Sequence, residues 1–351
     1  MSDLSIYEQV QRDGAMPLSR FMELAIAQYY ANRQAFGASG DFVTAPEISQ
    51  MFGEMIGAWI IDVWQQMGCP QFDLIECGPG QGTLMADLMR VGKSVDGFVG
   101  KVQIRFIEAS QRLRDIQAVA LDEYDVTFHD TLLDVQTNSP CIVLGNEFLD
   151  ALPIEQLMRT EKGWRQRFVV IKGDALAFEW GDVEGDLLDL LPSKTQSQQI
   201  YEISPARDKF IGQCGDLISR NLGASLFIDY GYIESHYSDT LQVVRGHSYG
   251  DVLSDVGASD MTSHVDFDAL SRRLLKSNLS VSKCVTQGRF LCSLGIDVRA
   301  KALSAVAKDK EQALKVDSGL HRLTHKDEMG DLFKVICFYK GEITPAGFET
   351  S

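Results

Sequence analysis

The sequence predicts an α/β fold built on a mostly parallel sheet, and two observations lead to this expectation. From Phe72 onward, short apolar runs of strand length alternate with longer segments of helical periodicity. Such alternation is typical of parallel strands joined by crossover helices. The first of these strands runs directly into a glycine-rich turn, Gly78-Pro79-Gly80-Gln81-Gly82, and then into a helix. Open α/β sheets build nucleotide sites at turns of this kind.

The elements are expected in the following order. Before the alternation begins, apolar spacing predicts helices over 17–35 and 47–67, with a loop from Gly37 to Pro46 between them. The alternating part then gives strand 72–76, helix 82–91, strand 102–107, helix 110–121, strand 125–128 and strand 141–145. It resumes with helix 205–221, strand 224–229, helix 266–277, strand 280–286 and a last pair of strands, or of strand and helix, over 319–340.

Between Glu155 and Ile200 the pattern changes to short β-like runs separated by the turn residues Lys162-Gly163 and Gly173-Asp174. We therefore expect a β-rich insertion over 155–200, which forms a substrate lobe. The chain then divides into an N-terminal helical lid segment over 1–70, a core made of 71–154 and 201–351, and this insertion.

Composition limits the partners. The 351-residue chain has a formal net charge of −16 at pH 7. A surface this acidic argues against non-specific binding to nucleic acid or to an anionic membrane, since both need basic residues. The longest apolar stretch, Met51 to Met67, is interrupted by Glu54 and Asp62 and is too short to span a bilayer. We expect no nucleic-acid partner and no membrane insertion.

The cysteines indicate the compartment. There are seven of them, scattered along the chain and without a C-x-x-C pair, which favours free thiols in a reducing environment. The first residues, Met1-Ser2-Asp3-Leu4-Ser5, lack the features of a secretion signal or of an organellar presequence. The expected localisation is therefore cytoplasmic.

The glycine spacing favours one kind of nucleotide. A dinucleotide fingerprint would place its third glycine at residue 83, which is Thr. Glu76, at the end of the strand, would repel a pyrophosphate but can compensate the charge of an ammonium group. The pattern E-x-G-x-G-x-G resembles the first motif of class I S-adenosylmethionine (SAM) methyltransferases, where the acid and the turn hold the cationic amino-acid part of SAM.

Six segments occur in the order seen in the MidA family of class I SAM-dependent methyltransferases, and they are spread over nearly the whole chain: Gly40–Gln50, Glu76–Thr83, Gly145–Pro153, Asp229–Gly231, Thr262–Phe267 and Met329–Lys334. The resemblance implies a Rossmann-like methyltransferase sheet with SAM as the cofactor. Mitochondrial members of that family are protein arginine methyltransferases that assist assembly of respiratory complex I by symmetric dimethylation of an arginine on one of its subunits. The implied partner is a protein substrate bearing an arginine.

The cofactor residues follow the strand ends. Gly78, Gly80 and Gly82 are expected against the methionine part of SAM, with Glu76 at its ammonium group. Glu108 ends the second strand, where a carboxylate can accept from both ribose hydroxyls; the alternative is an acid that stabilises the start of the next helix. Asp130, after the third strand, is expected at the exocyclic amine of adenine.

The fourth strand leads into Asn146-Glu147-Phe148-Leu149-Asp150. Glu147 and Asp150 are the candidate catalytic residues, because carboxylates bind a guanidinium group in a bidentate geometry and fix its rotation. The alternative is that Asn146 and the acids after it merely begin a helix.

Four more residues are candidates for substrate binding. Asp41 and Glu47 lie in the N-terminal loop, which is expected to fold over the cofactor as a lid; the alternative is a capping box formed by Thr44 and Glu47. Asp229 and His264 are expected to line the substrate channel. His321 and His325 have helical spacing but lack a third ligand nearby, so no metal site is expected.

Two other classes of function remain as alternatives. An NAD-dependent oxidoreductase shares this fold, although it would favour glycine at residue 83. A non-catalytic assembly scaffold would keep the fold and lose the cofactor acids, whereas Glu76 and Glu108 are present. The acceptor, the number of methyl groups added and the oligomeric state stay open at this point.

Overall fold

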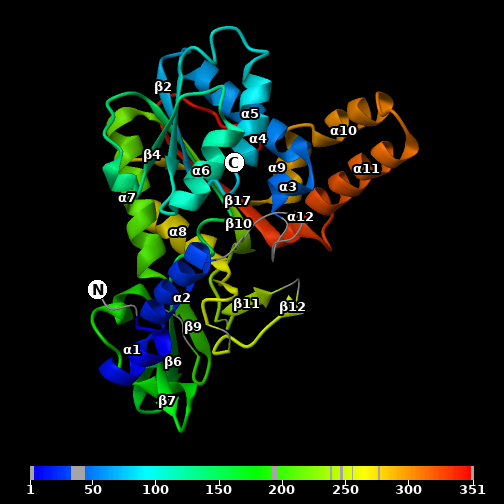
Figure 1. Cartoon of the computed structure of the whole chain (residues 1–351). Coiled ribbons are helices and arrows are strands. Elements are labelled where there is room, and N and C mark those ends of the chain that lie inside the picture. Colours follow the sequence, from blue (N-terminus) through cyan, green and yellow to red (C-terminus); the bar gives the residue numbers. More distant parts are fainter. Residues whose placement is uncertain are drawn as a thin grey trace. The chain divides into compact units, whose positions relative to one another are not determined.

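The computed structural model describes residues 4–32, 44–191, 196–237, 239–245, 248–254, 256–275 and 277–348. The chain forms two compact units (Figure 1). The larger unit comprises 43–149, 211–233 and 265–351, and the smaller unit comprises 1–42, 150–210 and 234–264. Each unit is thus assembled from three separate stretches of the sequence.

The larger unit contains a sheet with the strand order β15-β17-β10-β5-β2-β3-β4. From β4 to β10 the neighbouring strands are parallel, and β17 lies antiparallel to β10. The short strands β14 and β16 pair with β10 and β17. The strands are β2 (Phe72–Cys77), β3 (Val102–Ile107), β4 (Val126–His129), β5 (Cys141–Asn146), β10 (Gly223–Tyr232), β14 (Val265–Asp266), β15 (Ser280–Val281), β16 (Val285–Thr286) and β17 (Phe333–Lys340). The expected mostly parallel α/β sheet is confirmed.

The helices of the larger unit are α3 (Ala45–Ile48), α4 (Gln50–Gln66), α5 (Thr83–Gly92), α6 (Gln111–Ala120), the 3-10 turn η1 (Leu132–Asp134), α8 (Phe267–Leu274), α9 (Gln287–Ser293), α10 (Ile296–Ala305), α11 (Lys310–Thr324) and α12 (Met329–Leu332). Helix α7 (Pro205–Asn221) begins in the smaller unit and continues in the larger one. Buried side chains of α4, such as Trp59 and Ile60, join the apolar core with residues of β2 and β10. The sheet is therefore anchored by a helix that is apolar around most of its circumference.

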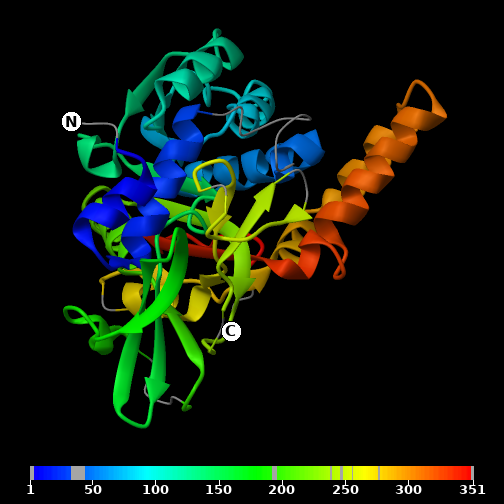
Figure 2. The same cartoon turned by 60° about the horizontal axis from the view of Figure 1, so that its bottom comes forward.

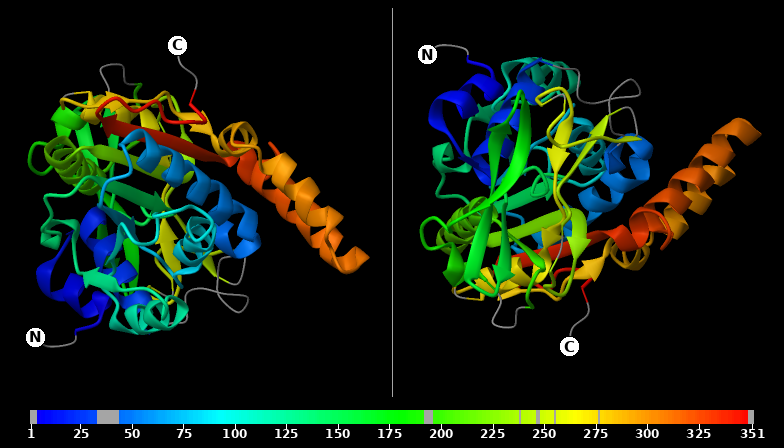
Figure 3. Two further views of the ribbon diagram at one scale, coloured as in Figure 1. Left: turned by 90° about the horizontal axis from the view of Figure 1, so that it is seen from above. Right: turned by 90° about the horizontal axis from the view of Figure 1, so that it is seen from below.

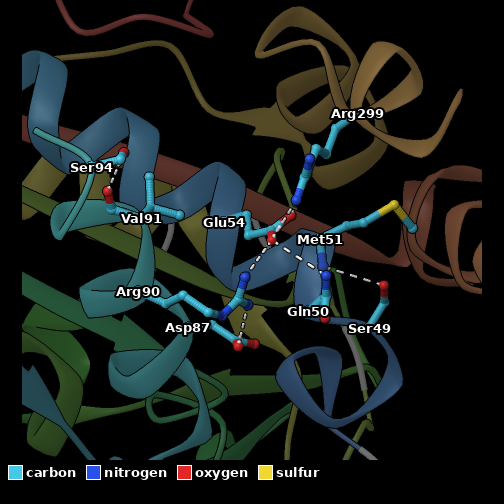
Figure 4. A network of polar contacts seen from close by, with 9 residues as sticks. All are labelled: Ser49, Gln50, Met51, Glu54, Asp87, Arg90, Val91, Ser94 and Arg299. Carbon is cyan, nitrogen blue, oxygen red and sulfur yellow. Dashed lines mark hydrogen bonds and ion pairs between the residues drawn. The ribbon is translucent and has the colours of Figure 1, made fainter. Parts of the chain in front are cut away.

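A buried carboxylate connects three of these helices (Figure 4). Glu54 of α4 accepts hydrogen bonds from Arg90 of α5 at 2.7 Å and from Arg299 of α10 at 2.7 and 2.9 Å. Burial raises the pKa of Glu54, but the two arginines more than offset this, so its pKa is lowered. The ion pairs fix the base of the α10–α11 hairpin, which projects from the sheet-bearing body of its unit in both views of Figure 3.

The smaller unit is built around an antiparallel sheet of order β1-β7-β6-β9, with β8 paired to β7 (Figure 2). A second sheet has the order β12-β11-β13. The apolar core of the unit joins α2 residues such as Phe21 and Met22 to Val169 and Met261. Its elements are α1 (Ile6–Asp13), β1 (Met16–Pro17), α2 (Leu18–Asn32), β6 (Glu155–Thr160), β7 (Gly163–Lys172), β8 (Ala175–Gly181), η2 (Leu187–Leu190), β9 (Ile200–Ile203), β11 (Gln242–Arg245), β12 (Ser248–Tyr249) and β13 (Asp260–Thr262).

Most of the expected elements are confirmed within a few residues, and the differences have local causes. The expected strand 280–286 consists of the two short strands β15 and β16, which pair with different parts of β17. The helices α1, α9 and α10 were not predicted from the sequence. Within the part of the chain that the structure describes, no helix combines the length and the apolar composition needed to cross a membrane.

Candidate active site

The turn after β2 adopts backbone conformations that favour glycine. The φ angles are +64° at Gly78, +56° at Gly80 and +82° at Gly82, all in the left-handed region. A Cβ on Gly78 would lie 2.9 Å from the ring of Phe148, so side-chain packing also requires glycine there. Gly82 is the N-cap of α5, which begins at Thr83. A ligand can therefore lie directly against the main chain of this turn.

Glu76 lies next to the end of β2 and is only 3% exposed. Its Oε2 atom has no hydrogen-bond partner among the residues that the structure describes. Burial raises the pKa of the Glu76 carboxyl to about 8. A buried carboxyl without a partner is unfavourable unless a cation compensates it. This residue therefore fits the ammonium group of SAM.

Glu108 follows β3 and is connected to the glycine turn. Its Oε1 accepts from the amide of Ser110 at 2.8 Å, and its Oε2 accepts from Nε2 of Gln117 at 3.3 Å. The same Nε2 donates to the carbonyl of Gly80 at 2.8 Å. Gln117 is a fully buried residue of α6. Sequence reasoning missed it because a glutamine in an amphipathic helix is usually expected on the solvent-exposed face. It links the expected ribose carboxylate to the turn that is expected to hold methionine.

Asp130 follows β4 and is largely exposed. It forms an ion pair with Nη2 of Arg114 at 2.6 Å, and Nε of Arg114 donates to the carbonyl of Glu108 at 2.7 Å. Asp130 and Glu108 follow the neighbouring strands β4 and β3, and Arg114 contacts the side chain of the first and the backbone of the second. His129 has a lowered pKa, mainly because of burial.

Glu147 stands directly after β5 with a φ of +51°, which is unusual for a residue other than glycine. Its amide donates to the carbonyl of Ile228 at 2.9 Å. Its Oε1 accepts from the amide of Ala45 at 3.0 Å and from Nδ2 of Asn146 at 3.2 Å. Residues 147–154 form bends and turns, so the alternative in which Asn146 begins a helix is wrong.

Asp229 of β10 holds the turn that follows Glu147. Its Oδ2 accepts from the amides of Phe148 and Leu149 at 3.1 and 2.8 Å, and its Oδ1 accepts from the amide of Tyr230 at 3.0 Å. The side chain is only 1% exposed. These contacts make Asp229 a positioning residue for the backbone beside Glu147, a task that the sequence pattern alone did not indicate.

The segment before α4 contacts both Glu147 and the glycine turn after β2. Glu47 of α3 accepts from Nε2 of Gln81 at 3.0 Å, while Ala45 donates to Glu147. Within the described residues, Thr44 makes no side-chain cap at the start of α3, so the capping-box alternative is wrong. Glu47 therefore lies against the glycine turn. Asp41, the other candidate from this loop, lies outside the described residues.

Two candidates belong to the smaller unit. Oδ1 of Asp150 accepts from the amide of Ala151 at 2.8 Å, and the carbonyl of Asp150 accepts from the amide of Ser263 at 3.1 Å. The amide of His264 donates to Oγ1 of Thr240 at 2.9 Å. Arg207, at the start of α7, donates to the carbonyls of both Asp150 and His264. This buried arginine, which sequence reasoning also missed, fixes the two candidates relative to one another.

The part of the chain that the structure covers contains no group of three His, Cys, Asp or Glu side chains able to hold a metal ion. His321 and His325 stack on each other, with ring centroids 4.3 Å apart.

Comparisons with known proteins identify the class. Residues 55–285 match a family model described as "Putative S-adenosyl-L-methionine-dependent methyltransferase". The chain is 32% identical to "Protein arginine methyltransferase NDUFAF7, mitochondrial" of Xenopus tropicalis, over 93% of this chain and 83% of the relative. It is also 32% identical to the Drosophila melanogaster homolog of that protein, over 93% and 82% of the two chains.

A crystal structure from Burkholderia thailandensis, of a candidate methyl transferase bound to S-adenosyl-homocysteine, has a TM-score of 0.83 and 25% identity. It covers 97% of this chain and 92% of that chain. The fold, the glycine turn and these similarities define an S-adenosylmethionine-dependent methyltransferase with the class I fold. The chain belongs to the MidA family of such enzymes, and SAM is its cofactor. The expected enzyme class is confirmed, and the oxidoreductase and scaffold alternatives are set aside.

Proposed function

We propose that this enzyme methylates an arginine side chain of a protein, and that the protein is a subunit of respiratory complex I. Relatives that match most of this chain are named protein arginine methyltransferases, which supports the acceptor class. The resemblance to the MidA family supports the link to complex I. Free thiols at all seven cysteines support the cytoplasm as the compartment.

The observation that carries the proposal is the position of Glu147. Its backbone is held in the left-handed region at the carboxyl end of β5, where open α/β sheets bind their ligands. Strained backbone of this kind costs on the order of 1 kcal/mol and occurs mainly where function requires it. The strain places a carboxylate next to the cofactor turn, and a carboxylate is the group that best orients a guanidinium.

The remaining residues have complementary tasks. When bound, SAM supplies an electrophilic methyl group on a positively charged sulfur. Glu76 holds its ammonium group, Glu108 accepts from its ribose hydroxyls and Asp130 accepts from its adenine amine. These contacts fix the donor, so that catalysis depends mainly on positioning.

On the acceptor side, Glu147 orients one guanidinium nitrogen towards the methyl group and stabilises the positive charge. The nitrogen that accepts the methyl group loses its proton once it is alkylated. Asp150 is the second candidate carboxylate, and Asp41, Glu47 and His264 are candidates for further contacts with the substrate. Asp229 acts indirectly, because it holds the backbone of the turn beside Glu147 in place.

We also propose that the segment around Glu47, within the N-terminal stretch 1–70, acts as a lid over the cofactor and that the sheet of 155–200 binds the protein substrate. Segments with a role in recognition lie outside the minimal core of a fold more often than within it.

The test is transfer of an isotopically labelled methyl group. The full chain is incubated with methyl-labelled SAM and a lysate of its own host, and the labelled protein is hydrolysed to amino acids. We expect the label in methylated arginine. Label confined to lysine, to another residue or to small molecules would refute the arginine assignment.

A further inference from the structure

The smaller unit buries a cluster of polar side chains around Asp150, and three of them have no role in the reaction described above. It consists of Tyr30 from α2, Asp150 from the segment before β6, and Asp260 and Thr262 from β13. Asp150, Asp260 and Thr262 are 5%, 9% and 2% exposed. Tyr30 donates to Oδ2 of Asp260 at 3.4 Å. We call these four residues the Tyr30 cluster.

The strand geometry shows that Asp260 and Thr262 share one face of β13. Side chains alternate between the two faces of a strand, and Met261, which lies between them, packs into the apolar core with Val243. Asp260 and Thr262 therefore point to the opposite face. Helix α2 packs against β13 and brings the phenol of Tyr30 to Asp260. The hydroxyl of Thr262 is thus aimed to the same side as the carboxylate.

The backbone of Asp150 is hydrogen-bonded next to the end of β13. The carbonyl of Asp150 accepts from the amide of Ser263, the residue that directly follows Thr262. The charge of Asp150 also reaches Tyr30: burial raises the pKa of the phenol well above its usual value, and both Asp260 and Asp150 raise it further. Two carboxylates thus act on one buried hydroxyl.

Thr262 provides an independent sign of a ligand. Its Oγ1 atom is buried and has no hydrogen-bond partner among the residues described by the structure. Leaving a buried hydroxyl without a partner costs about 1–3 kcal/mol. A cationic donor would relieve this cost, and the negative charge of the nearby carboxylates would attract it.

We propose that the Tyr30 cluster is a binding site for a guanidinium group of the protein substrate. A guanidinium has five N–H donors in one plane. A carboxylate can accept two of them side by side, and the oxygens of Thr262 and Tyr30 can accept others. The proposal rests on the proposed function, because it takes the substrate to be a protein that presents arginine. It adds Tyr30, Asp260 and Thr262 to the residues that select this substrate.

The test uses agmatine, a small molecule that carries a guanidinium group, and the full chain saturated with S-adenosyl-homocysteine. Binding is measured by titration calorimetry for the wild type, for Asp260→Asn and for Tyr30→Phe, which removes only a hydroxyl group. We expect Asp260→Asn to weaken binding about tenfold or more and Tyr30→Phe to weaken it about threefold, because charged acceptors contribute more than neutral ones.

The matched control is Glu179→Gln, which alters a carboxylate of the same unit that pairs with Lys172 on the surface. It should leave agmatine binding unchanged. The proposal is overturned if the wild type does not bind agmatine, or if Tyr30→Phe and a folded Asp260→Asn bind it as the wild type does. If Asp260→Asn does not fold, Tyr30→Phe alone decides. A methyl label on a residue other than arginine would refute the proposed function instead, and it is measured separately.

Discussion

SAM binding should expel a proton from Glu76. With a pKa of about 8, roughly nine in ten Glu76 carboxyls are protonated at pH 7. An ammonium group favours the ionised form of a neighbouring carboxyl, so the carboxyl must ionise when SAM binds. The number of protons released at pH 7 should therefore be close to one per SAM bound.

The affinity should follow the same linkage. Between about pH 5 and pH 8, the dissociation constant of SAM should fall by up to about tenfold for each unit that the pH rises, since one pKa unit corresponds to about 1.4 kcal/mol. Above about pH 8 the gain should stop, because the Glu76 carboxyl is then already ionised before SAM binds. Loss of the proton from the α-amino group of SAM should weaken binding at still higher pH. Without SAM, the raised pKa means that the folded state holds the proton more tightly than the unfolded state. The stability of the free protein should therefore fall as the pH rises from about 4.5 to about 8.

The assay is titration calorimetry at pH 7 in phosphate and in Tris, whose ionisation enthalpies differ. The difference between the two apparent enthalpies gives the number of protons released. Glu76→Gln should abolish the release and weaken binding. Glu155→Gln is the matched control, because Glu155 is also buried with a raised pKa but lies in the smaller unit. Equal proton release by the wild type and Glu76→Gln would refute the reasoning.

Three further changes test other parts of the structure. Gly80→Val forces a β-branched residue into a left-handed conformation at φ +56°, which costs about 1–2 kcal/mol. Calorimetry should detect no SAM binding, while circular dichroism should still show a cooperative melt. Unchanged affinity would show that SAM does not bind at this turn. Asp229→Asn removes a charged acceptor of three amide hydrogen bonds. The free energy of unfolding in urea should therefore fall by about 2 kcal/mol, and methyl transfer should slow at least tenfold. Transfer at the native rate would show that the turn beside Glu147 does not depend on Asp229. Glu54→Gln should lower the free energy of unfolding by about 2 kcal/mol at pH 7. Below the lowered pKa of Glu54 the difference should be much smaller, because the wild-type carboxyl is then uncharged as well. An equal difference at both pH values would contradict the role of the ion pairs.

The cofactor turn was predictable from the sequence because its chemistry is local. The three glycines have positive φ angles, and a strand that ends in an acid before such a turn leaves few other interpretations. The parallel strands β2, β3 and β5 were likewise visible as short apolar runs. These features depend on backbone conformation and burial, which neighbouring residues largely determine.

Contacts between distant segments were not predictable in the same way. Gln117 is important only because the fold brings Gly80 and Glu108 to it. Arg207 is important only because carbonyls from two distant segments, 150 and 263–264, converge on it. The strand β1 has two residues and pairs with Phe168 and Val169, too short for any periodic pattern. Helix α10 buries Ile296 and Ala300, which are too few apolar residues to produce a clear helical pattern.

The most direct test of the account compares methyl transfer by the wild type and by Glu147→Gln. Both proteins are incubated with deuterated-methyl SAM and host lysate, and the modified residue is located and quantified by mass spectrometry. The account predicts the deuterated methyl group on an arginine of one protein. It also predicts a rate about 100-fold or more lower for Glu147→Gln, since a preorganised charge is lost, with SAM affinity nearly unchanged. Transfer to an arginine at the native rate by Glu147→Gln, or wild-type transfer to another kind of residue, would contradict the account.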